Sequence, residues 1–104
     1  MSIYATESFG PTVSLLPFPT EAAAIATAND TEYGLSSAIF TRDLAAALRI
    51  ARQLETGAVH INNMSVHDEP NLPHGGCKMS GFGRFNGSAG LEEFQRSKTI
   101  TWAD

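Results

Sequence analysis

Three short segments rich in strand-forming residues alternate with two stretches of helical character, and this alternation restricts the possible folds more than any other feature. Residues 11–18, 33–41 and 58–61 are each predicted as a strand, because they are largely apolar and are bounded by proline, glycine or polar residues. Strands that alternate with helices of about a dozen residues are typical of βαβ units. The sequence therefore predicts an α/β fold with parallel strands and covering helices.

Both connecting stretches carry signals that begin and end a helix. Thr20 can cap an alanine-rich helix that ends at Asn29–Asp30. Asp43 can cap a second helix, in which leucine and alanine recur at helical spacing. Gly57 is expected to end this second helix in a left-handed conformation.

The remainder of the chain begins with a long loop over residues 62–87, which is rich in glycine and proline. A loop of this length inside a compact domain is uncommon unless it is functional, so it is the first place to look for chemistry. A helix is predicted over residues 88–98 and a last strand over residues 99–102. The sequence shows no internal repeat, so residues 1–104 are expected to form one unit, a single partial domain.

Composition and charge exclude several functions. The chain has 104 residues, of which 42% are hydrophobic and 17% charged, so a folded protein is expected. Its net charge of −4 and its lack of basic clusters argue against a nucleic-acid partner. It shows no signal peptide and no apolar run long enough to cross a membrane. With a single cysteine, which cannot form an internal disulfide, a cytoplasmic location is expected.

Three candidate sites lie in the long loop, and each has a structural alternative. His67, His74 and Cys77 could converge on a metal ion, although no helical histidine pair or close cysteine pair is present. Cys77 could act as a nucleophile, but only Lys78 stands beside it to lower its pKa. The glycines of residues 81–87 depart from the dinucleotide-binding spacing and are interpreted as turn geometry. No metal site is therefore assigned.

Three motifs occur in the order found in one enzyme family. They are Glu-Ser-Phe-Gly-Pro at residues 7–11, Ala-Asn-Asp-Thr-Glu-Tyr-Gly-Leu at residues 28–35, and Gly-Gly-Cys-Lys-Met-Ser-Gly-Phe-Gly-Arg at residues 75–84. Together they resemble the C-terminal part of the NAD(P)-dependent aldehyde dehydrogenase superfamily. Residues 66–70 and 83–85 look most like members that act on aromatic aldehydes such as benzaldehyde, salicylaldehyde or vanillin.

The resemblance implies roles for individual residues. Glu7 matches the glutamate that accepts hydrogen bonds from the nicotinamide ribose of NAD or NADP, and Phe9 matches the ring beside the nicotinamide. His74 stands where many members place a phenylalanine of the aldehyde pocket. The loop of residues 65–73, which contains His67 and Asp68, corresponds to the segment that shapes the substrate entrance.

The resemblance also implies which parts of the reaction lie elsewhere. In the family, a cysteine thiolate attacks the aldehyde, hydride passes to the nicotinamide, and a glutamate base assists hydrolysis of the thioester. The family's nucleophile, base and dinucleotide-binding domain precede the region matched here, so no catalytic residue is assigned. We expect a C-terminal fragment of a longer oxidoreductase, which alone is inactive and binds no cofactor. The alternative is a stand-alone, non-catalytic remnant or assembly module.

Assembly is the last expectation from the resemblance. The final strand of family members lies in a small sheet that pairs with a neighbouring subunit, and residues 99–102 fit such an exposed strand. A homo-oligomer is therefore expected, and the isolated chain should self-associate because a piece of a larger domain leaves apolar surface uncovered.

Overall fold

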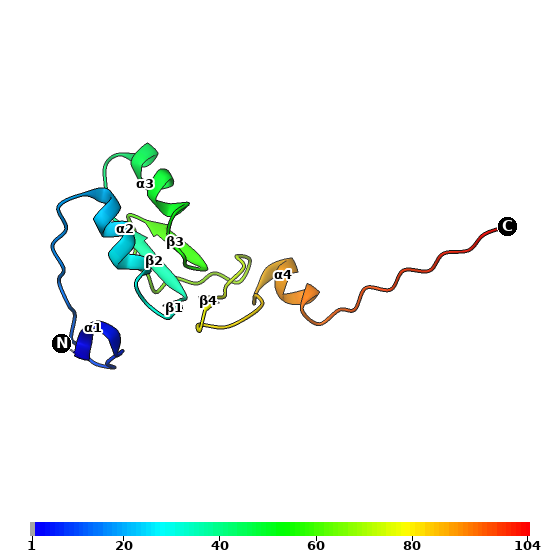
Figure 1. Ribbon diagram of the computed structural model, residues 1–104. Helices are drawn as coiled ribbons and strands as arrows, with labels where there is room; N and C mark the ends of the chain where they lie inside the picture. The colour runs from blue at the N-terminus through cyan, green and yellow to red at the C-terminus, as the bar shows by residue number, and fades with distance from the viewer. Residues whose placement is uncertain (1) are drawn as a thin grey trace.

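Two parallel strands joined by a helix form the centre of the folded region (Figure 1). The computed structural model describes residues 2–104, so residue 1, at which the expected domain begins, lies outside the described part. Strand β2 (Ser36–Ile39) pairs with β3 (Ala58–Ile61) from Ser36 opposite Ala58 to Ile39 opposite Ile61. Helix α3 (Leu44–Ala51) connects them. This βαβ unit agrees with the α/β class predicted from the sequence.

Helices α2 (Glu21–Asn29) and α3 begin at the caps predicted from the sequence. The Thr20 hydroxyl accepts a hydrogen bond from the backbone N–H of Ala23 at 3.2 Å, and the Asp43 carboxylate accepts one from Ala46 at 3.0 Å. Ala47 in α3 is completely buried. Between α2, α3 and β2 lies an open, mainly apolar groove of about 610 Å³.

A second, antiparallel pair joins distant parts of the sequence. Strand β1 (Tyr33–Gly34) pairs with β4 (Cys77–Lys78), with Gly34 opposite Cys77. The prediction of one strand over residues 33–41 is therefore wrong, because the chain divides at Leu35 into two strands with different partners. The predicted irregular loop over residues 62–87 likewise contains β4, since its backbone finds hydrogen-bonding partners far away in the sequence.

Two other predicted strands are absent from the described chain. Residues 11–18 and 99–102 have no regular secondary structure. A strand needs a neighbour for its backbone N–H and C=O groups, and neither segment forms backbone hydrogen bonds with another strand of the described residues. Val13, Leu15 and Trp102 are 81%, 86% and 85% exposed. The prediction over residues 11–18 is wrong for this chain, and pairing of residues 99–102 with a second chain stays a prediction.

The helical boundaries also differ from the predictions in two places. Helix α4 covers Gly87–Glu92 instead of residues 88–98, because Phe94 beyond it is 88% exposed and packs on no surface that would extend the helix. Helix α3 ends at Ala51, well before Gly57. Gly57 does not have the left-handed conformation that was expected of it. A glycine is needed there for another reason, because a side chain would collide with the backbone of Gly75.

The C-terminal end of the chain extends away from this centre (Figure 1). The unpredicted helix α1 (Ser2–Ala5) lies at one end, and the segment after α4 leads away from the fold (Figure 1). The radius of gyration is 17.9 Å, whereas about 13 Å is typical of a compact domain of this length. The most exposed apolar side chains lie at both ends and in the glycine loop: Phe9, Leu15, Phe82, Phe94 and Trp102. Over residues 2–104, no helix is long and apolar enough to cross a membrane.

The contact between α2 and α3 predicts how stability changes with pH. The Arg49 guanidinium donates to both Glu21 carboxylate oxygens, at 3.1 and 2.8 Å. This hydrogen bonding with Arg49 lowers the pKa of Glu21. Ionised Glu21 therefore stabilises the fold above its ordinary pKa of 4.5, and the contribution is lost as the pH falls through the lowered value.

We expect the urea midpoint of Glu21→Gln to lie slightly below that of the wild type at neutral pH, and the difference to shrink in acid. The effect is small because both side chains are exposed. Glu32→Gln, in which an exposed carboxylate is changed, serves as the control. A difference that persists unchanged into strong acid would contradict this assignment.

Candidate functional site

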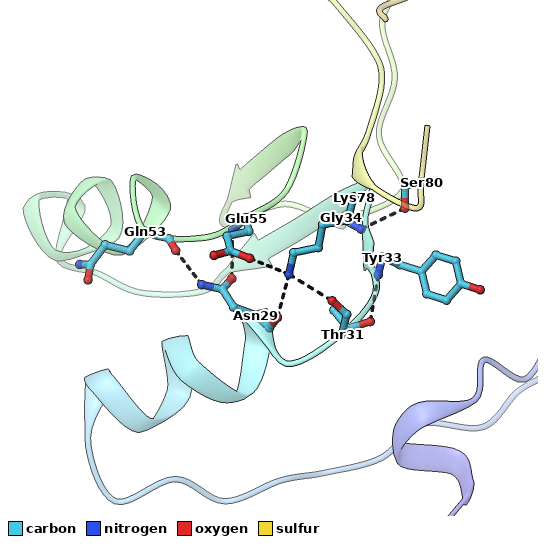
Figure 2. A network of polar contacts seen from close by, with 8 residues as sticks. All are labelled: Asn29, Thr31, Tyr33, Gly34, Gln53, Glu55, Lys78 and Ser80. Atoms are coloured by element: carbon cyan, nitrogen blue, oxygen red, sulfur yellow. Dashed lines mark hydrogen bonds and ion pairs between the residues drawn. The ribbon is translucent and has the colours of Figure 1, made fainter. Parts of the chain in front are cut away.

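The Lys78 side chain joins three segments near the end of α2 (Figure 2). Its ammonium group donates to the backbone oxygens of Asn29 at 2.7 Å and Thr31 at 3.1 Å. It also lies 2.7 Å from a carboxylate oxygen of Glu55, and the lysine side chain is only 24% exposed. One cation therefore holds together strand β4, the end of α2 and the turn that precedes β3.

The Asn29 side chain extends this network to the turn that follows α3 (Figure 2). Its amide nitrogen donates to the backbone oxygen of Gln53 at 2.8 Å, and its amide oxygen accepts from the backbone N–H of Glu55 at 2.9 Å. Both polar ends of the asparagine are thus satisfied by one turn. The turn holds the backbone of Glu55, whose carboxylate meets Lys78.

The Ser80 hydroxyl makes a further link between two of the sequence motifs. It accepts a hydrogen bond from the N–H of Gly34 at 3.0 Å, and the N–H of Met79 donates to the backbone oxygen of Glu32 at 2.9 Å. Gly34 is buried, and a side chain there would collide with the backbone oxygen of Glu55. The motifs at residues 28–35 and 75–84 therefore form one scaffold, in which polar side chains of one motif bind the backbone of the other.

Glu7 lines an open groove of about 440 Å³ that this scaffold forms with α1. The other wall includes Tyr33 and Ser80. The Tyr4 hydroxyl donates to the carboxylate of Asp30 at 2.6 Å, which attaches α1 to the end of α2. This hydrogen bond raises the pKa of Tyr4. Sequence reasoning missed Tyr4, since nothing in its sequence context indicates so distant a partner.

The two residues that the resemblance assigns to the cofactor are both accessible. The Glu7 carboxylate makes no hydrogen bond or ion pair with any other residue of the 2–104 segment. The Phe9 ring is 97% exposed. A free carboxylate can accept hydrogen bonds from two neighbouring hydroxyl groups, and an exposed ring can pack against a planar heterocycle. These residues therefore fit the ribose and nicotinamide groups expected from the sequence.

The structure brings Asp68 and His74 together. An Asp68 carboxylate oxygen lies 3.8 Å from the Nδ1 atom of His74. The backbone of His74 exchanges two hydrogen bonds with Phe85, at 3.0 and 2.7 Å. Asn86, which sequence reasoning missed, donates to the same Asp68 oxygen at 2.8 Å. The Asn-Gly pair at residues 86–87 is a turn signal that could have indicated an unusual backbone there.

His67 lies apart from this pair in its contacts. Its Nε2 atom is 3.1 Å from the Glu69 carboxylate, and its ring packs edge-on against His60 with centroids 5.3 Å apart. Cys77 is half-buried in β4. In residues 2–104, no group of three His, Cys, Asp or Glu side chains is arranged to hold a metal ion. His67, His74 and Cys77 have separate partners instead of a common centre.

Comparisons with known proteins identify the family. Residues 1–100 match the aldehyde dehydrogenase family, so the chain belongs to this family. It is 46% identical over 101 residues to a vanillin dehydrogenase from Pseudomonas fluorescens, a match that covers 97% of this chain and 21% of the relative. A 4-trimethylaminobutyraldehyde dehydrogenase from Danio rerio is also 46% identical, over 96% of this chain and 20% of the relative. The chain thus spans about a fifth of these relatives.

Solved structures show the same relationship. A salicylaldehyde dehydrogenase from Pseudomonas putida G7, complexed with salicylaldehyde, superposes with a TM-score of 0.86 and 47% identity, over 89% of this chain and 19% of that one. A Mycobacterium tuberculosis aldehyde dehydrogenase complexed with NAD+ superposes with a TM-score of 0.85 and 42% identity, over 90% and 19%. The family predicted from the three motifs is confirmed.

Removal of the Lys78 charge tests whether the motif network is structural. Lys78→Met keeps most of the aliphatic stem but leaves two backbone oxygens and one carboxylate without their donor. We expect the free energy of unfolding in urea to fall by about 1–2 kcal/mol, near the lower end for charged hydrogen bonds because the site is partly exposed. Lys98→Met, at an exposed lysine, should change it little, and equal effects of both variants would contradict the assignment.

Proposed function

We propose that these residues serve as the C-terminal part of an enzyme that oxidises an aldehyde to a carboxylic acid with NAD or NADP. The observation that carries the proposal is the joined scaffold of residues 28–35 and 75–84, which places Glu7 on a groove with its carboxylate uncommitted. The similarity to a dehydrogenase complexed with NAD+ supports the same role. The nicotinamide, when bound, supplies the hydride acceptor.

The roles of the cofactor-facing residues follow from their chemistry. Glu7 accepts the two hydroxyl protons of the nicotinamide ribose, and Phe9 packs beside the nicotinamide ring. Both residues lie on the segment that follows α1, which the Tyr4–Asp30 hydrogen bond attaches to α2. The catalytic nucleophile and base belong to family regions outside the matched residues.

The substrate in this proposal is an aromatic aldehyde. His74, His67 and Asp68 contribute to its pocket, and residues 65–73 form part of its entrance. The similarity to relatives named for vanillin and salicylaldehyde supports this class. The equally similar 4-trimethylaminobutyraldehyde dehydrogenase makes an aliphatic cationic aldehyde the alternative to be tested beside it.

A second candidate function is a non-catalytic assembly module. The extended shape and the exposed apolar side chains at both ends favour a chain that packs against other protein surface. This candidate requires no cofactor and no nucleophile. An activity assay separates the two, because only the first candidate predicts NAD(P)-dependent oxidation.

Glu7→Gln tests the assignment of the cofactor. In the complete protein that carries residues 1–104, we expect NAD(P)H to form with vanillin or benzaldehyde. Glu7→Gln should raise the KM for the dinucleotide roughly tenfold, since an amide has one acceptor oxygen where the carboxylate has two charged ones.

Glu92→Gln, at a glutamate in α4 outside the groove, is the matched control and should leave this KM unchanged. An unchanged KM in Glu7→Gln would remove Glu7 from the cofactor site. A complete protein that reduces neither NAD nor NADP with an aromatic or an aliphatic cationic aldehyde would favour the assembly module.

The C-terminal segment is proposed to add a strand to a second copy of the chain. Ile100 and Trp102 are 77% and 85% exposed, and the backbone around them is free of hydrogen bonds within the described chain. Successive N–H groups of a strand point to opposite sides, so proline at two adjacent positions removes the donors on both. We expect the double variant Ile100→Pro, Thr101→Pro to sediment as a smaller species than the wild type.

The conservative pair Ile100→Val, Thr101→Ser keeps both donors and serves as the control. Sedimentation velocity at equal protein concentrations measures the difference. If the proline variant and the control sediment alike, residues 99–102 do not form the pairing strand.

A further inference from the structure

Asn86 connects the loop of residues 65–73 to the beginning of α4. Its side-chain amide donates to the Asp68 carboxylate at 2.8 Å and to the backbone oxygen of Glu69 at 3.2 Å. Its backbone has φ of +67°, a left-handed conformation that is unfavourable for a residue other than glycine. The two hydrogen bonds of the side chain offset this cost, so a glycine at this position would keep the backbone but lose the contact.

The same Asp68 oxygen faces the imidazole of His74. It lies 3.8 Å from Nδ1, and the two backbone hydrogen bonds with Phe85 hold His74 in place. At this distance the carboxylate does not accept a hydrogen bond, but its negative charge favours a proton on Nδ1. The neutral ring then has Nε2 as its hydrogen-bond acceptor. Nε2 has no hydrogen-bonding partner among residues 2–104, and the side chain is 30% exposed.

We propose that Asn86 and Asp68 are positioning residues that present His74 Nε2 as an acceptor for a hydroxyl group on the ring of an aromatic aldehyde. This inference rests on the proposed function, because it takes His74 to be part of the aldehyde pocket. Asn86 holds the Asp68 carboxylate, Asp68 selects the tautomer, and Nε2 accepts the phenolic proton. The substrate class is therefore a hydroxybenzaldehyde.

The chemistry distinguishes three substrates of similar size. A hydroxybenzaldehyde can donate to Nε2, a methoxybenzaldehyde has only an acceptor oxygen at the same position, and benzaldehyde has neither group. The preference is measured as the ratio of kcat/KM for hydroxybenzaldehyde to kcat/KM for methoxybenzaldehyde. Benzaldehyde serves as a reference in each variant, since it tests the reaction without the contact.

Kinetics of the complete protein test the contact. We expect His74→Phe to lower the ratio by roughly tenfold and Asn86→Gly by roughly threefold, the range for loss or weakening of one hydrogen bond. Asn86→Gly removes the amide without disturbing a left-handed backbone. Gln95→Ala, at an exposed glutamine outside residues 65–73 and without a side-chain hydrogen bond among the described residues, should leave the ratio unchanged.

The imidazole tautomer supplies a readout that does not depend on activity. With ¹⁵N-labelled histidine, the His74 signals, assigned through His74→Phe, should show a protonated Nδ1 in the wild type. Asn86→Gly and Asp68→Ala should shift the population toward the form protonated on Nε2. A purely structural role of Asn86 would leave the tautomer unchanged.

The outcomes separate this inference from the function on which it rests. If no aldehyde is oxidised but the tautomer responds to Asn86→Gly, the positioning network exists and the proposed function fails. If all three benzaldehydes are oxidised while neither the ratio nor the tautomer changes in the variants, the function stands and the positioning role is overturned.

Discussion

The Lys78 ammonium group is the point on which the rest of the structure depends. Among residues 2–104, Ala47 is the only hydrophobic residue that is fully buried. Apolar packing alone therefore holds little of this chain together. The Lys78 ammonium group binds two backbone oxygens and a carboxylate. It thereby holds together strand β4, the end of α2 and the turn that precedes β3. Partial burial of Lys78 strengthens these contacts, since water screens them less.

Many large apolar side chains of this chain are exposed instead of buried. Side chains such as Leu15, Phe94 and Trp102 are exposed at both ends, where the backbone also lacks strand partners. Apolar surface and unpaired backbone groups are both stabilised by contact with other protein. The proposed roles in a larger enzyme and in a pairing strand use the same physical property of these segments.

Local signals predicted where helices α2 and α3 begin, but they predicted the strands less well. Thr20 and Asp43 cap their helices because a cap depends on residues two or three positions away. A strand depends on a distant partner, which residues 33–34 find in β4 and residues 11–18 do not find in this chain. Similarly, the motif residues Asn29, Lys78 and Ser80 were evident in the sequence, but Lys78 contacts Asn29, and Ser80 contacts Gly34, across more than 40 residues.

The sequence by itself determined the family, the α/β class, the helix caps and the candidate residues Glu7, Phe9 and His74, because these follow from residue order and short-range chemistry. Only the tertiary structure decided that Asp68 faces His74, that Asn86 holds Asp68, and that Tyr4 attaches α1 to α2. These contacts join residues separated by loops whose path depends on distant backbone partners. A linear pattern does not contain that path, and the folded chain does.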